Sequence, residues 1–101
     1  MELIGRAQTE TGVGNAPRAV ELLEEALAIA VKARDRQWQC TTLVNLGGGF
    51  QRLKRYDKAM KHFEQAHTIA DELGNRYEEG NALNGLGSCF LRLAKYPYGK
   101  G

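Results

Sequence analysis

Residues 43–66 read LVNLGGGFQRLKRYDKAMKHFEQA. Two apolar faces begin in this stretch, and in each one the apolar residues recur at the spacing of an amphipathic helix. The first face consists of Leu43, Leu46, Gly47, Phe50 and Leu53, and the second of Ala59, Phe63, Ala66, Ile69, Ala70 and Leu73. Only residues 54–57 separate the charged end of one helix from the start of the next, which leaves room for a tight turn. The stretch therefore predicts two antiparallel helices packed against each other.

The same pattern recurs along the chain with a period of 40 residues. Leu43, Leu46, Gly47, Phe50, Arg52, Leu53 and Tyr56 are repeated as Leu83, Leu86, Gly87, Phe90, Arg92, Leu93 and Tyr96. Ala59, Glu64, Ala66, Ile69, Ala70 and Arg76 repeat Ala19, Glu24, Ala26, Ile29, Ala30 and Arg36. We expect helices near residues 1–11, 17–33, 36–54, 57–73 and 76–95. These form a divergent repeat (1–34), a complete repeat (35–74) and the first helix of a truncated repeat (75–101), all in one domain (1–101).

Helix start and stop signals agree with these boundaries. Gly74 can adopt the left-handed conformation that ends a helix. Asn75 can cap the following helix, with Glu78 three residues later as the second member of a capping box. Asp35 occupies the equivalent capping position one repeat earlier, and Pro17 lies in a first helical turn, where proline is tolerated.

Composition excludes several classes of function. The chain has 101 residues and a formal net charge of +2, without the clustered basic face that nucleic-acid binding requires. No apolar run approaches the length that crosses a bilayer, and the N-terminus does not resemble a signal peptide. Cys40 and Cys89 lie far apart and have no neighbours at metal-ligand spacing. We expect a cytoplasmic protein with reduced, buried thiols and no cofactor, metal, membrane or nucleic-acid partner.

The residues of the complete repeat resemble the tetratricopeptide repeat, a helical hairpin with a large residue, Leu-Gly and an aromatic in its first helix. The matching residues are Leu43, Leu46, Gly47, Phe50, Tyr56, Ala59, Phe63 and Ala66. The period of 40 and the sequence Gly74-Asn75-Arg76 are similar to the long-repeat branch found in G-protein-signalling modulators and kinesin light chains. The resemblance implies an all-α, right-handed solenoid of about five helices and an adaptor function rather than catalysis.

In the resembled family the first helix of each hairpin lines a concave groove. Opposite the buried face of these helices lies a polar stripe of small side chains and amides that ends twice in arginine. It consists of Thr41, Asn45, Gly48 and Arg52 in one repeat and Asn81, Asn84, Gly85, Ser88 and Arg92 in the next. Asparagine can hydrogen-bond a peptide backbone, and arginine can pair with a carboxylate. We expect this stripe to bind a peptide or partner protein, and we expect acidic groups of that partner to lie at the arginines.

Other functions remain open. The chain could be a structural unit that stacks on further copies, or a regulatory domain that senses short peptides. The family's modules that grip a chaperone C-terminus use lysine and asparagine residues. Asn45 matches one asparagine of that set, but Thr41, Gly48, Asn81 and Gly85 supply none of its basic residues. RNA binding is also not expected, since the stripe lacks stacking aromatics.

The apolar face of the last helix predicts a contact surface. We expect Leu46, Phe50, Phe63, Ile69 and Leu86 to be buried in the core. The final repeat nevertheless carries Leu83, Leu86, Phe90 and Leu93 with no second helix predicted to cover them. Exposed apolar patches of this kind mark interaction sites. We therefore expect either a homodimer through helix 76–95 or a fragment of a longer array.

Overall fold

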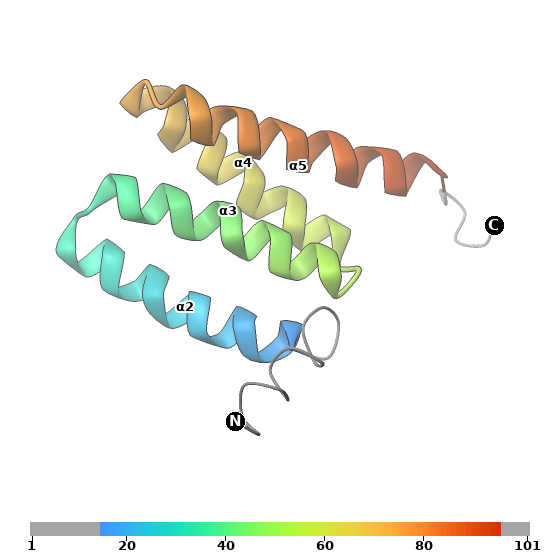
Figure 1. The fold of residues 1–101 in the computed structure, drawn as a ribbon, viewed down its shortest axis with the longest axis horizontal. Coiled ribbons are helices and arrows are strands. Elements are labelled where there is room, and N and C mark those ends of the chain that lie inside the picture. The colour runs from blue at the N-terminus through green and yellow to red at the C-terminus, as the bar shows by residue number, and fades with distance from the viewer. Residues whose placement is uncertain (1–14, 96–101) are drawn as a thin grey trace, which may run out of the picture.

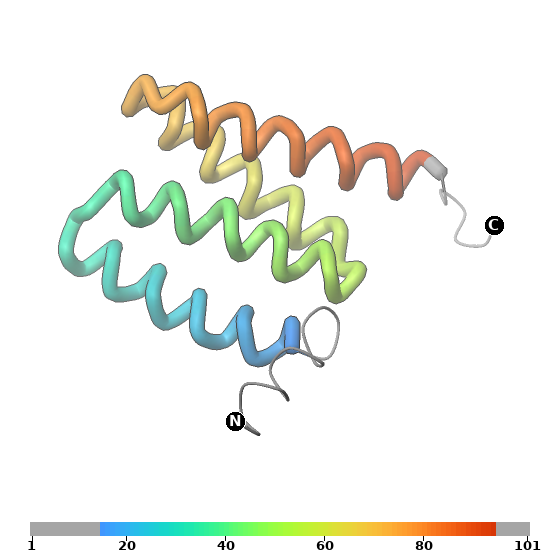
Figure 2. The backbone as a smooth tube through the Cα atoms, viewed as in Figure 1, coloured from blue at the N-terminus to red at the C-terminus, as the bar shows by residue number. Residues whose placement is uncertain are grey.

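The computed structural model describes residues 15–95, which form four α-helices and no strand. These are α2 (Ala16–Ala33), α3 (Arg36–Arg52), α4 (Tyr56–Leu73) and α5 (Arg76–Lys95). Each helix lies against the next along the chain, with α2 and α5 at the two outer edges (Figures 1 and 2). The helix expected at 1–11 lies outside the described residues. The all-α fold predicted from the repeat is confirmed.

The helix ends confirm most of the predicted signals. Gly74 has φ 69°, and the backbone N–H of Asn75 donates to the carbonyl of Ala70, five residues earlier. The carboxylate of Asp35 accepts the backbone N–H of Trp38 at 3.0 Å. The α3 helix ends at Arg52 rather than at residue 54, because Lys54 adopts a left-handed conformation with φ 61°.

The predicted capping box at the start of α5 is only half formed. Asn75 Oδ1 accepts the backbone N–H of Glu78 at 3.0 Å, as expected. The backbone N–H of Asn75 already donates to Ala70, so the carboxylate of Glu78 does not take its usual partner. Instead Glu78 is buried and accepts the hydroxyl of Thr41 at 2.7 Å and the amide of Asn81 at 3.2 Å. The bond from Thr41 joins α3 to α5 across consecutive repeats, whereas the bond from Asn81 lies within α5.

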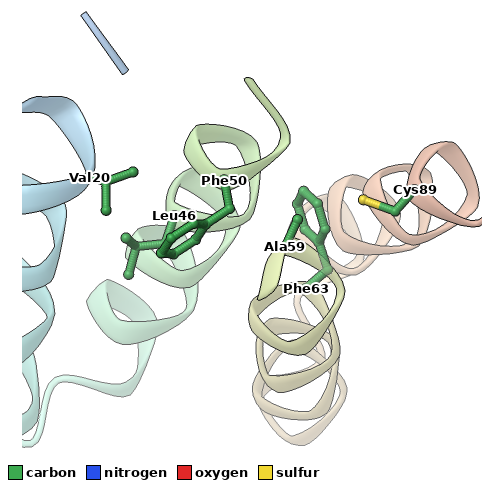
Figure 3. Close-up of a cluster of buried hydrophobic side chains, with 6 residues drawn as sticks. All are labelled: Val20, Leu46, Phe50, Ala59, Phe63 and Cys89. Carbon is green, nitrogen blue, oxygen red and sulfur yellow. The ribbon is translucent and has the colours of Figure 1, made fainter. Parts of the chain in front are cut away.

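Two apolar clusters form the core. One contains Val20, Leu46, Phe50, Ala59, Phe63 and Cys89, and the other contains Cys40, Leu43, Ala66, Ile69, Ala70 and Ala82. Leu27 and Val44 pack against both clusters and so connect them. In the first cluster, Val20 faces Leu46 and Phe50 on one side of α3 (Figure 3). Four of the five residues predicted to be buried are buried, namely Leu46, Phe50, Phe63 and Ile69.

The fifth residue predicted to be buried in the core, Leu86, is not fully buried. It is only partly buried and packs against the first cluster from one side. Its repeat equivalent, Leu46, is fully buried because α3 lies between α2 and α4. Among the described helices, α5 packs against α3 and α4 and has no neighbour on its outer side. Three of the four apolar residues predicted to form a contact surface on α5, namely Leu83, Phe90 and Leu93, are therefore exposed.

The aromatic ring of Phe63 explains two of the glycines. A Cβ atom on Gly47 of α3 would lie 2.6 Å from Phe63 Cε1, and one on Gly85 of α5 would lie 2.6 Å from Phe63 Cε2. Gly47 therefore allows α4 to approach α3 closely. A Cβ on Gly49 would lie 2.8 Å from Val20 Cγ2, so this glycine permits the packing of α2 on α3. Phe63 thus fills the space between α3 and α5 (Figure 3).

Candidate functional site

A groove of about 820 Å³ opens along α3 and α5, with α2 at one edge. Its walls are formed by Ala19, Leu22, Leu23, Val44, Asn45, Gly48, Gly49, Gln51, Arg52, Phe63, Asn81, Asn84, Gly85 and Ser88. Seven of the nine residues of the predicted polar stripe line it: Asn45, Gly48, Arg52, Asn81, Asn84, Gly85 and Ser88. The alignment of the first helices of two repeats brings these side chains, 40 residues apart in the chain, onto one surface.

The other two residues of the predicted stripe lie elsewhere. Thr41 is not part of the groove wall: its hydroxyl donates to Glu78 and accepts from Gln37 Nε2 at 3.1 Å. Its polar group therefore holds α3 to α5. Arg92 lines a recess of about 430 Å³ that adjoins the groove and shares Gly48, Gln51 and Arg52 with it.

The glycines of the stripe have different roles. A Cβ atom on Gly48 would have no other heavy atom within 4 Å, so its lack of a side chain widens the groove. Gly85 belongs to the same stripe and also lines the groove. In the structure its missing side chain makes room for the Phe63 ring, so Gly85 serves packing as well as lining the groove.

Amide groups supply hydrogen-bonding capacity on the groove walls. Asn45 of α3 and Asn84 of α5 are exposed, and their side chains form no hydrogen bond with any residue of 15–95. Each amide can donate and accept at once, as a peptide unit of an extended segment requires. Asn81 differs, because its amide already donates to Glu78. Two of the three asparagines are thus available to a ligand.

The recess at the arginine end of the groove is rich in donors. Arg92 Nη1 donates to the hydroxyl of Tyr56 at 3.4 Å, and Gln51 Nε2 donates to Ser88 Oγ at 2.9 Å. The ion pairs found within the described chain are Arg18–Glu21, Arg36–Glu72 and His67–Glu79. Neither Arg52 nor Arg92 takes part in one. This end of the groove therefore carries two positive charges that no carboxylate of residues 15–95 pairs with.

Sequence reasoning missed several groove residues. Gln51 has Leu91 as its repeat equivalent, so periodicity gave no signal for it. Tyr56, which lines the adjoining recess, does recur as Tyr96, and this repetition could have identified it. Leu22 and Leu23 come from α2, a helix of the preceding repeat, and only the packing of α2 on α3 brings them to the groove edge.

Outside the groove, the two cysteines are buried and His62 is stacked on an aromatic ring. Burial raises the pKa of the Cys89 thiol, and burial followed by the nearby Glu78 carboxylate raises that of Cys40, with Arg36 opposing. Both thiols are thus held in their unreactive form. His62 stacks on Phe50, with ring centroids 5.0 Å apart.

Across residues 15–95, His, Cys, Asp and Glu form no cluster of three or more that could hold a metal. None of the four helices is both long and apolar enough to span a bilayer.

Comparison with known proteins agrees with this architecture. The family described as "Tetratricopeptide repeat" matches residues 3–72 and again residues 38–97. The chain is also similar to the 43 kDa receptor-associated protein of the synapse from Tetronarce californica, with 26% identity over 83 residues. That alignment covers 82% of this chain and 20% of the relative, so the chain spans about a fifth of the relative's length. The family match extends over residues 3–97 and agrees with the two repeat periods and with the groove lined by their first helices. The chain therefore belongs to the tetratricopeptide repeat family, whose repeats mediate protein–protein interaction.

Proposed function

We propose that the chain is an adaptor module that binds an extended segment of a partner protein in the groove between α3 and α5. The observation that carries the proposal is that one surface combines Asn45 and Asn84, whose amides form no hydrogen bond within residues 15–95, with Arg52 and Arg92, which no carboxylate of residues 15–95 pairs with. Asn45 and Asn84 are positioned to hydrogen-bond the backbone of the segment. Arg52 and Arg92 lie at one end, where acidic side chains of the segment would be placed. The relative from Tetronarce californica is named for association with a receptor, which is in keeping with a protein partner.

The binding segment is expected to be extended rather than helical. Free amides on a groove wall satisfy peptide groups that have no partner of their own, and a helix already satisfies most of its own. Gly48 gives the backbone room to approach α3 closely. The apolar side chains of Leu22, Leu23 and Val44 form part of the wall and offer contacts to alternate side chains of the segment.

An unbiased pull-down tests the proposal. The chain is immobilised as wild type and as the double variant Arg52→Glu/Arg92→Glu, and bound proteins are quantified by mass spectrometry. A matched control, Lys61→Glu/Arg76→Glu, makes the same change in net charge at two exposed residues that do not line the groove. Proteins that bind the wild type and the control but not the groove variant support the proposal. Equal capture by all three would place the binding surface elsewhere.

The exposed face of α5 supports a second candidate, self-association. Leu83 and Phe90 are 50% and 64% exposed. Their repeat equivalents Leu43 and Phe50 pack against α4 and are only 4% and 7% exposed. Leu93 is also exposed, while Leu86, the fourth residue of the predicted interface, is half-buried by the core. Soluble proteins seldom leave several large apolar side chains accessible on one helix face.

Light scattering over a range of protein concentrations tests this second candidate. A two-fold dimer through α5 predicts twice the monomer mass at high concentration and the monomer mass for Phe90→Ser. A monomer at every concentration would remove self-association from consideration and leave the groove as the interaction surface.

A further inference from the structure

The recess beside the groove combines two arginines with neutral donors. Arg52 and Arg92 occupy equivalent positions of consecutive repeats, and both line the recess together with Gly48, Gln51 and Tyr56. No described carboxylate lines it. Two like charges around one recess disfavour each other unless an anion lies between them. The arrangement thus favours an anionic ligand at this place.

The number of donors distinguishes between classes of anion. A carboxylate has two oxygens, and a single arginine can occupy both in a bidentate pair. The recess offers more than this: two arginines, the hydroxyl hydrogen of Tyr56 and the second amide hydrogen of Gln51. Arg92 uses only one N–H on the oxygen of Tyr56, and Gln51 uses only one on Ser88. A carboxylate would leave one arginine charge unbalanced and several donors without an acceptor.

A phosphate monoester matches both the charge of the two arginines and the number of hydrogen-bond donors in the recess. It carries a charge of about −2 near neutral pH and has three terminal oxygens that accept hydrogen bonds. It would therefore balance both arginines and could accept from all four side chains that line the recess and carry donors. Gly48 adds to this fit, because the open space beside it lets a bulky tetrahedral group enter from the groove.

We propose that this recess binds a phosphorylated side chain of the peptide that lies in the groove. The proposal rests on the proposed function for its peptide and extends it, because it makes phosphorylation of the partner the event that strengthens binding. Phosphorylation adds charge at a position where the unmodified hydroxyl could make only a neutral hydrogen bond.

Small probes test the recess without any partner protein. Phosphoserine blocked at both ends, aspartate blocked in the same way and inorganic phosphate are titrated into the ¹⁵N-labelled chain. The arginine Nε–Hε signals in NMR spectra report on the site. We expect saturable shifts of Arg52 and Arg92, with blocked phosphoserine binding roughly tenfold more tightly than blocked aspartate. Equal affinities for the two, or no saturable shift, would overturn the proposal.

Variants assign the binding to the two arginines. Arg52→Gln/Arg92→Gln is expected to abolish the preference for phosphoserine. The matched control Lys61→Gln/Arg76→Gln, with the same charge change, is expected to keep it. Arg76 lies 16 residues before Arg92 on α5, roughly 24 Å away along the helix axis. Retention of the preference in the first variant, or loss in both, would overturn the proposal.

A last comparison separates a peptide site from a site for free phosphate. A seven-residue peptide with phosphoserine at its centre should bind more tightly than blocked phosphoserine, and Asn45→Ala/Asn84→Ala should remove this gain. A peptide that binds no better than inorganic phosphate would overturn the assignment to a phosphopeptide. Failure of the adaptor function has a different signature, in which the small phosphate probes bind but no protein is captured by the groove.

Discussion

A methyl group added at Gly85 is expected to destabilise the chain, although alanine favours helices over glycine. In an unstrained helix position this exchange stabilises by about 0.5–1 kcal/mol. At Gly85, however, the new Cβ would lie 2.6 Å from Phe63 Cε2, well inside van der Waals contact. The ring cannot move away freely, since it also lies against Gly47 of α3. Overpacking of this kind costs roughly 1–3 kcal/mol.

The expected result is a net loss of roughly 1–2 kcal/mol in the free energy of unfolding for Gly85→Ala. Thermal unfolding followed by circular dichroism measures it, and each kcal/mol shifts Tm by about 4–8 °C in a domain of this size. Gly80→Ala and Gly87→Ala are matched controls in the same helix, because a Cβ at either position meets nothing within 4 Å. Both controls are expected to raise Tm.

A double-mutant cycle identifies the cause. If the Phe63 ring is the obstacle, the smaller side chain of Phe63→Leu should relieve the strain of Gly85→Ala. The double variant should then lose less stability than the sum of the two single variants. A Gly85→Ala variant as stable as Gly80→Ala, or a strictly additive cycle, would refute the reasoning that Phe63 fixes the distance between α3 and α5.

Three further predictions follow from single residues. Arg34 is exposed and has φ 57° at the position where the next repeat has Gly74, so Arg34→Gly should raise the free energy of unfolding by about 1 kcal/mol, measured by urea titration. Phe63→Ala should lower the free energy of unfolding by about 3–5 kcal/mol, because Phe63 is only 3% exposed. A loss under about 1 kcal/mol in the same titration would contradict the role of Phe63 in the core. Burial raises the pKa of the Cys40 and Cys89 thiols, so both should react slowly with a thiol reagent at pH 7.5 in the folded chain and rapidly in denaturant. Rapid labelling of the folded chain would contradict the packing of the two thiols.

Local signals were sufficient to predict the helices. Helical spacing of apolar residues and the capping residues Asp35, Gly74 and Asn75 depend only on neighbours within a few positions of the chain. The predicted boundaries of the four described helices consequently agree with the structure within two residues. The end of α3 was misplaced because the left-handed conformation of Lys54 has no signature in its residue type.

Contacts between distant helices could not be predicted in the same way. Phe63 requires glycine at both position 47 and position 85, which becomes evident only when three helices are packed together. Glu78 was assigned to a local cap, yet it bonds Thr41 from the neighbouring repeat and removes that hydroxyl from the groove. The polar stripe itself was predictable because equivalent faces of α3 and α5 align, whereas the contribution of α2 was not.

Site-specific photo-crosslinking tests most directly whether the groove between α3 and α5 binds the partner. A photoreactive amino acid is placed at position 45, on the groove wall, or at position 61, an exposed position of α4 outside it. With the proteins that the wild-type chain captures, we predict crosslinks from position 45 and none from position 61. Crosslinks from position 61 alone would contradict the assignment of the groove as the binding surface.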